Sequence, residues 1–180
     1  MRLFTAITFS EEMKNSLYHS IKELQHYALS GNYTLKENLH LTLNFIGETG
    51  RTEAVKEAME QAVYKAGRRR FLLSTGELGR FKRREGDIYW IGVNKDPSLL
   101  LLQKELAREL KKEGFTLEDR EFQPHLTLGR KVIMGKDFDR TAMERSLPPE
   151  AMEVTKISLM KSERIKGRLT YTEIYHIDLE

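Results

Sequence analysis

Apolar and polar residues recur along the chain in two periods, one typical of β-strands and one typical of α-helices. Short alternating or apolar runs predict strands at residues 2–8, 39–46, 70–75, 88–93, 122–129, 153–161 and 169–179. Apolar residues three and four positions apart predict helices at residues 10–28, 52–66, 96–114 and 137–146. Together these elements predict an α+β fold.

Two of the expected helices carry clear signals at their ends. Ser10 can accept a hydrogen bond from a first helical turn, and Asp96 followed by Pro97 is a typical helix start. Gly31 and Gly114 follow the expected ends of the same two helices. The predicted buried stripes are Met13, Leu17, Ile21, Leu24 and Ala28 in the first helix, Val55, Met59, Ala62 and Val63 in the second, and Leu99, Leu102, Leu106 and Leu110 in the third.

The order strand, helix, strand, helix, strand occurs twice in the sequence. The tetrapeptide HLTL at residues 40–43 returns at residues 125–128, which is 85 positions later. The same shift places the strand at residues 2–8 on residues 87–93, and the first helix on the third. No segment rich in proline, glycine or serine separates the two copies, so we expect them to pack as one unit.

This duplication predicts a single two-lobed domain with a pseudo-two-fold axis. The domain is expected to span residues 1–180, with repeat halves at approximately 1–78 and 86–161 and a final strand at 169–179. Each lobe should be an antiparallel sheet with helices on its outer face. The two HLTL strands should face each other across a central groove.

The HLTL strands place polar and apolar side chains on opposite faces, because residues two apart in a strand share a face. His40 and Thr42 therefore point one way, and His125 and Thr127 do the same in the second copy. The leucines between them are expected to pack against the helices of their own lobe. A two-fold axis would then bring two imidazoles and two hydroxyls around one small volume.

Two imidazoles at one site suit phosphodiester chemistry. The unperturbed pKa of histidine is about 6.5, so one neutral ring can accept a proton from water while the other, protonated, donates to the leaving oxygen. Threonine hydroxyls can bind the non-bridging phosphate oxygens. The motif contains no carboxylate or thiolate, so we expect no metal ion and no other cofactor.

Composition and charge limit the kinds of site that the chain can form and the compartments in which it can work. Cysteine is absent, which excludes disulfides and thiolate metal sites and fits a reducing compartment. No segment has the length and apolarity of a membrane span, and the N-terminus lacks the pattern of an export signal. The formal charge is only +3. We expect a monomer in the cytoplasm that does not bind membranes.

Several stretches resemble one protein family. They are Phe4, Ala6 and Ile7 in the first strand, ENLHLTLNFIG at residues 37–47, IYWIGV at 88–93, FQPHLTLGR at 122–130, and the late Ser162, Gly167 and Tyr171. With these residues the chain resembles the 2H phosphoesterase superfamily, whose members carry two His-x-Thr-x motifs. Within that superfamily it is most similar to the RNA 2′,3′-cyclic phosphodiesterases, also described as 2′-5′ RNA ligase-like.

The resemblance implies an enzyme of RNA processing that acts on RNA 3′ ends. It would hydrolyse a terminal 2′,3′-cyclic phosphate to a 2′-phosphate without a metal ion, with a reversible 2′-5′ RNA ligase activity as a further expectation. By position, His40 would be the proton donor and His125 the proton acceptor, while Thr42 and Thr127 would bind the phosphate. The two motifs are nearly symmetric, so the sequence by itself leaves the assignment of acid and base open.

Residues near the motifs extend this expectation to substrate binding. The guanidinium of Arg130 offers paired donors for a phosphate, and Phe45 or Tyr89 could stack on a terminal base. Three basic clusters could follow an RNA backbone. They are Arg68, Arg69 and Arg70; Arg80, Lys82, Arg83 and Arg84 in a polar loop expected at residues 79–87; and Lys161, Arg164, Lys166 and Arg168.

Three alternatives remain open from the residues alone. The substrate could be a small cyclic nucleotide, an ADP-ribose cyclic phosphate or a 2′-5′ oligoadenylate rather than RNA. The protein could bind RNA ends without turning them over. His40 and His125 could instead hold a divalent metal, although two histidines without an acidic partner make a poor site. His19, His26 and His176 are assigned no role.

Overall fold

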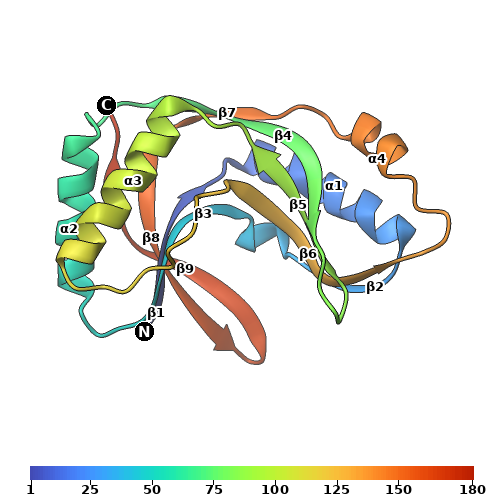
Figure 1. The fold of residues 1–180 in the computed structure, drawn as a ribbon, viewed down its shortest axis with the longest axis horizontal. Helices are drawn as coiled ribbons and strands as arrows, with labels where there is room; N and C mark the ends of the chain where they lie inside the picture. The colour runs from blue at the N-terminus through green and yellow to red at the C-terminus, as the bar shows by residue number, and fades with distance from the viewer.

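The computed structural model describes all 180 residues and contains four α-helices, nine strands and one turn of 3-10 helix (Figure 1). The elements are β1 (Arg2–Thr8), α1 (Glu11–Tyr27), β2 (Ala28–Tyr33), η1 (Lys36–Asn38), β3 (His40–Glu48), α2 (Thr52–Lys65), β4 (Phe71–Phe81), β5 (Asp87–Val93), α3 (Pro97–Lys112), β6 (His125–Met134), α4 (Arg140–Ser146), β7 (Ala151–Val154), β8 (Lys156–Ile165) and β9 (Arg168–Asp178). The predicted α+β fold is confirmed. None of the helices is long and apolar enough to cross a membrane.

The predicted helix starts are confirmed by their capping hydrogen bonds. The Ser10 side chain accepts from the backbone N–H of Met13, and the Asp96 side chain accepts from Ser98 and Leu99. The predicted stripes of the first three helices are buried, apart from Ala28, which lies beyond the end of α1. Helix position therefore follows from local sequence, as capping and periodicity require.

Several boundaries differ from the prediction. The chain passes from α1 directly into β2, a strand that the sequence analysis missed, and Gly31 lies inside it rather than ending the helix. The segment ALSGNY of β2 has no apolar alternation; it is a strand because it pairs with β6. β4 extends to Phe81, so the loop predicted at residues 79–87 is only residues 82–86. The strand predicted at 153–161 is divided between β7 and β8.

The strands form two sheets in the orders β3-β1-β8-β9 and β2-β6-β5-β4-β7. The run β3-β1-β8 in the first sheet corresponds to β6-β5-β4 in the second. β8 comes from the second half of the chain and β4 from the first, so the two halves exchange a strand. The helices are exchanged as well, because α1 packs against β6 and α3 against β3. The expectation that each leucine pair packs against helices of its own half was wrong.

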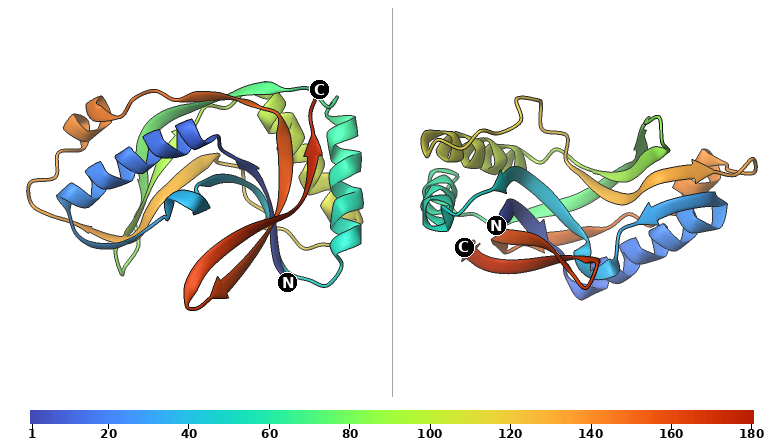
Figure 2. Two further views of the ribbon diagram at one scale, coloured as in Figure 1. Left: turned by 180° about the vertical axis from the view of Figure 1, so that it is seen from behind. Right: turned by 90° about the horizontal axis from the view of Figure 1, so that it is seen from below.

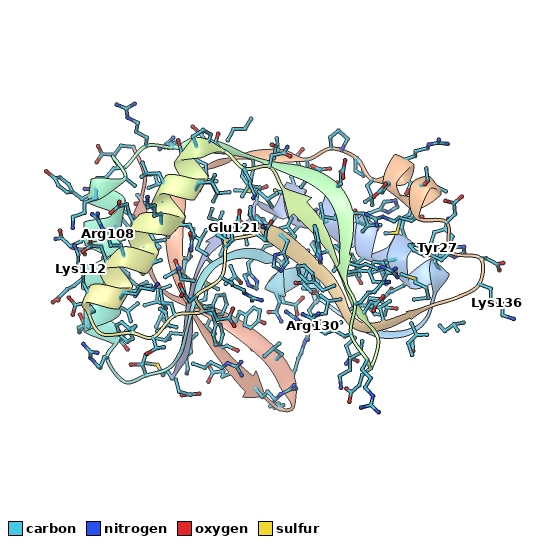
Figure 3. The ribbon with its side chains drawn as sticks, viewed as in Figure 1. Tyr27, Arg108, Lys112, Glu121, Arg130 and Lys136 are labelled. Carbon is cyan, nitrogen blue, oxygen red and sulfur yellow. The ribbon has the colours of Figure 1, made fainter.

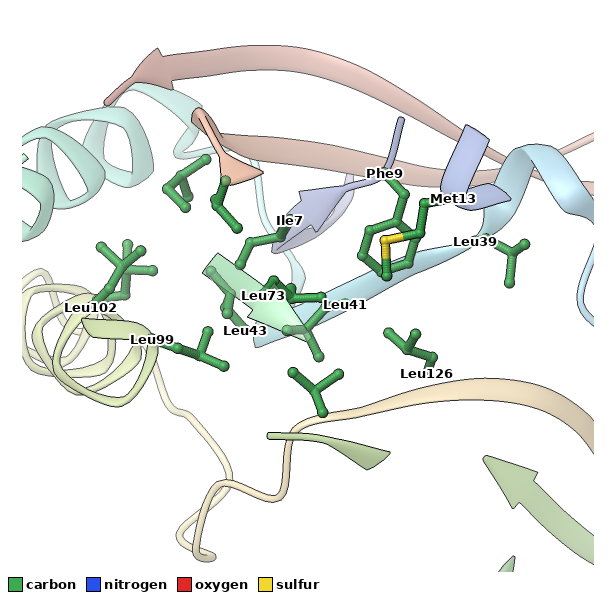
Figure 4. Close-up of a cluster of buried hydrophobic side chains, with 14 of the residues drawn as sticks. Ile7, Phe9, Met13, Leu39, Leu41, Leu43, Leu73, Leu99, Leu102 and Leu126 are labelled. Atoms are coloured by element: carbon green, nitrogen blue, oxygen red, sulfur yellow. The ribbon is translucent and has the colours of Figure 1, made fainter. Parts of the chain in front are cut away.

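One hydrophobic core joins both sheets. It contains Leu41 and Leu43 of β3 together with Leu126 and Leu128 of β6, all nearly inaccessible to solvent. Figure 4 shows Leu43 of β3 beside Leu99 of α3, with Leu41 and Leu126 farther along the same cluster. The alternation of HLTL thus buries its leucines as predicted and leaves its histidines and threonines on the opposite faces.

Candidate active site

Both histidines begin a strand and are held in the same way. Nδ1 of His40 lies 2.6 Å from the carbonyl oxygen of Asn38, and Nδ1 of His125 lies 2.6 Å from that of Gln123. A carbonyl oxygen can only accept, so Nδ1 donates in each ring. This hydrogen bond orients the ring and leaves Nε2 as the atom that exchanges a proton.

The two rings differ at Nε2. In His40 this atom lies 2.8 Å from the hydroxyl oxygen of Thr42. Nε2 of His125 makes no hydrogen bond within the protein, and Thr127 is half-buried on the same face of β6. The first motif is therefore internally bonded, whereas the second is free to meet a ligand.

The environment lowers the pKa of both histidines. Burial is the largest cause in each case, because it penalises the charged imidazolium, and the bond to the backbone carbonyl opposes it. The positive charge of Arg130 lowers the pKa of both rings, and His125 further lowers that of His40. The charge of Arg130 thus acts on both imidazoles, and β3 and β6, which carry them, are in contact.

Aromatic rings flank each imidazole. Phe4 and Tyr171 lie 4.9 and 5.1 Å from the ring centre of His40, with Tyr171 edge-on. Phe81 and Trp90 lie 5.4 and 5.8 Å from that of His125. Sequence reasoning assigned none of these four aromatic residues to the site, because which strands lie beside the motifs is a tertiary property.

A β-bulge in each motif strand sets which later residues face the groove. In β3, Thr42 is opposite Ala6 and Asn44 is opposite Thr5, so Leu43 has no partner. An extra residue of this kind shifts the following side chains to the other face. Phe45 consequently shares the face of Thr42. It is 42% exposed, and the guanidinium of Arg2 lies 5.0 Å from its ring centre.

The equivalent bulge in β6 acts on Arg130. Thr127 is opposite Trp90 and Gly129 is opposite Tyr89, so Leu128 is the extra residue. Arg130 comes two residues after Leu128 and is exposed. It lies 85 positions after Phe45, which is the spacing between the two HLTL motifs. Figure 3 shows Arg130 on the side of β6 that faces the β8–β9 hairpin. Strict alternation would not have placed either residue on the groove face.

The predicted stacking role of Tyr89 was wrong. Its side chain is only 3% exposed and packs edge-on against Phe138, with ring centres 5.9 Å apart. The next residue, Trp90, is the one opposite Thr127, whereas its counterpart in β1 is Ala6. Those two strands are therefore related by a shift of 84 positions, not 85, and a slip of one residue reverses the face of every side chain.

The basic clusters lie in different places. Arg68 and Arg70 pair with Glu180 and Glu153 near the C-terminus. The second and third clusters lie on the β4–β5 and β8–β9 hairpins, which project on the same side of the molecule (Figures 1 and 2). Arg80 and Arg168 in these clusters pair with Asp87 and Glu37. Lys161 pairs with Glu163, so the residues of these two clusters without an ion pair are Lys82, Arg83, Arg84, Arg164 and Lys166, all on the two hairpins.

No group of three or more histidine, cysteine, aspartate or glutamate side chains is placed to hold a metal ion. The candidate site residues supply two imidazoles, two hydroxyls and a guanidinium. This set can transfer protons and bind an anion.

Comparison with known proteins connects this geometry to a family. Residues 13–166 match the model of the 2′-5′ RNA ligase superfamily. The chain is 28% identical to an RNA 2′,3′-cyclic phosphodiesterase of Thermotoga maritima, over 100% of this chain and 96% of the relative. It is 31% identical to one of Methanocaldococcus jannaschii, over 90% and 91% of the two chains. The fold is similar to that of LigT of Escherichia coli complexed with 3′-AMP, with a TM-score of 0.76, 27% identity, and coverage of 99% and 97%.

Proposed function

Since the chain belongs to the 2′-5′ RNA ligase superfamily, we propose that it hydrolyses the 2′,3′-cyclic phosphate at an RNA 3′ end and leaves a 2′-phosphate. The observation that carries the proposal is the pair of imidazoles with Nδ1 held by a backbone carbonyl and Nε2 directed to the exchange of protons. The names of the relatives support the substrate class.

The structure favours His125 as the proton acceptor. Its Nε2 has no partner in the protein, so a water molecule can bind there and lose a proton to it. The water oxygen then attacks phosphorus while the bond from phosphorus to O3′ breaks. The phosphate remains attached through O2′.

His40 is the matching proton donor. It is the more enclosed ring, and a bound phosphate anion would raise its pKa and so supply the proton that O3′ needs on leaving. Thr42 bonds to His40 and is positioned to bind a phosphate oxygen, with Thr127 as its counterpart. Arg130 can bind a further oxygen with two N–H groups.

The reaction needs only one copy of the chain and fits the cytoplasm. Each half of the chain contributes one histidine, so a single copy holds a complete site and a monomer suffices. The absence of cysteine fits a cytoplasmic protein. A 2′-5′ ligation uses the same groups in the same roles: His125 accepts the proton of an RNA 5′-hydroxyl in place of water, the 5′ oxygen attacks phosphorus, and O3′ leaves with the proton of His40. Cleavage of the resulting 2′-5′ linkage is the reverse of this step.

The test is to incubate the purified protein, in excess EDTA, with a short RNA that ends in a 2′,3′-cyclic phosphate. The expected product has gained one water and resists a phosphatase specific for 3′-phosphates. A 3′-phosphate product would contradict the proposed direction of ring opening. Binding without turnover would instead support a protein that only captures RNA ends.

A further inference from the structure

A trough of about 630 Å³ lies beside the candidate active site, on the second sheet. Trp90 and Gly92 of β5 line it, and they are opposite Thr127 and His125 of β6. Residues opposite each other in antiparallel strands share a face of the sheet. The trough therefore continues the face that carries His125 toward β4.

Glycines make room for an aromatic platform in this trough. A Cβ atom at Gly79 would lie only 2.2 Å from the Trp90 ring, so glycine at this position lets the indole lie over the β4 backbone. Gly76 and Gly92 also line the trough and add no side-chain bulk. The Trp90 side chain is partly exposed, whereas its N–H is buried and has no acceptor in the protein. A partly exposed aromatic ring of this kind is a surface on which nucleobases stack.

The charges around the trough favour an anion. Arg80, Lys82 and Arg140 line it, with Glu77 as the only acidic residue among the lining side chains. Arg80 and Arg140 are paired with acidic side chains. Lys82 has no acidic partner, so it contributes an uncompensated positive charge suited to one phosphate.

No strand closes the outer side of the trough, where the guanidinium of Arg140 in α4 donates to the carbonyl oxygen of Leu78. In the first sheet, β9 pairs with β8 along its whole length. In the second sheet, β7 pairs only with Phe71–Ser74 of β4, and the edge beyond Ser74 has no neighbouring strand. A chain bound at the histidines can therefore continue across β5 and β4 without meeting a strand.

We propose that this trough binds the nucleotide immediately 5′ to the terminal one in single-stranded RNA. The base stacks on Trp90, and the phosphate that precedes it lies at Lys82. This subsite rests on the proposed function, since it orients an RNA whose cyclic phosphate lies between the two histidines. It makes the enzyme prefer RNA over a mononucleotide with the same cyclic phosphate.

The first test compares kcat/KM for a trinucleotide and a mononucleotide that both end in a 2′,3′-cyclic phosphate. The expected preference for the trinucleotide is about tenfold, the size of one base-stacking contact. Lys82→Glu and Trp90→Leu should each reduce this ratio toward one. Arg84→Glu is the matched control, because it makes the same charge change in the same loop but does not line the trough. The control should keep the ratio.

The second test does not depend on turnover. Trp90 is the only tryptophan of the chain, so its fluorescence reports directly on the trough. Titration with a trinucleotide that ends in a 2′-phosphate should quench this fluorescence. Lys82→Glu should weaken that binding several-fold, and Arg84→Glu should not.

The outcomes separate the two proposals. A ratio near one in the unmodified protein, or a ratio unchanged by both trough variants, overturns the subsite even if both substrates are hydrolysed. Hydrolysis of neither substrate overturns the proposed function, and the fluorescence titration then decides the subsite by itself. Absence of quenching by the trinucleotide would overturn it in that case.

Discussion

The two lobes carry the same motif in different surroundings. In the first sheet, β9 covers the edge of β8 and places Tyr171 edge-on against His40, whose Nε2 is bonded to Thr42. In the second sheet, no strand pairs with β4 beyond Ser74 on that side, and Nε2 of His125 is unbonded. The two equivalent histidines are therefore chemically distinct, with one enclosed and bonded and the other accessible.

Removing either imidazole should have the largest effect on activity. We expect His40→Ala and His125→Ala each to lower kcat/KM on a cyclic-phosphate RNA by roughly 10²- to 10⁴-fold, the usual contribution of a general acid or base. His176→Ala is the control, since that histidine is exposed and bonded to Glu173. Full activity in either of the first two variants would exclude the acid–base pair.

Replacing Arg130 should affect both histidines at once. Arg130→Met should lower kcat/KM by about 10- to 100-fold, because it removes a charged hydrogen bond to the phosphate. It should also raise the pKa of both histidines, since the guanidinium disfavours their protonated forms. The acidic limb of the pH profile of kcat/KM, which requires a neutral base, should then move to higher pH. An unchanged limb would argue against Arg130 as a shared neighbour.

Two aromatic variants should separate the lobes. Tyr171→Ala should raise the pKa of His40, and Phe81→Ala that of His125, because each removes burial that disfavours the imidazolium. Each variant should change the pKa of the other histidine by no more than a few tenths of a unit. NMR titration of the two rings measures both values in one sample. Equal shifts of both rings in either variant would mean that the surroundings are not independent.

The smallest expected effect concerns how the two halves are held together. Glu109 of α3 bonds to Lys112 and to Lys65 of α2, and these bonds lower its pKa to about 2. A carboxylate whose pKa is lower in the folded than in the unfolded state stabilises the fold at pH values above its unfolded pKa of about 4.3. This stabilisation is lost as the pH falls toward 2.

Glu109→Gln should therefore lower the melting temperature slightly at pH 7 and make no difference near pH 2. Thermal unfolding at the two pH values measures this. Glu57→Gln, an exposed position on α2 without an ion pair, is the control. An equal decrease at both pH values would indicate a packing defect rather than a lost charge interaction.

The sequence by itself determined most of the elements, and it singled out the candidate site residues. Helix starts at Ser10 and Asp96, the buried stripes, and the two-faced HLTL strands were all readable, because capping and periodicity depend on neighbours within a few positions. The repeat of HLTL predicted that two His-Thr pairs would share a groove.

Only the tertiary structure decided how the strands combine. The exchange of β4 and β8, the pairing that creates β2, and the bulges at Leu43 and Leu128 arise from contacts between segments distant in sequence. Those contacts put Trp90 on the face that carries His125 and Tyr89 in the core, although both lie in the same apolar run. The face of a strand residue depends on register with its partners, which no local pattern specifies.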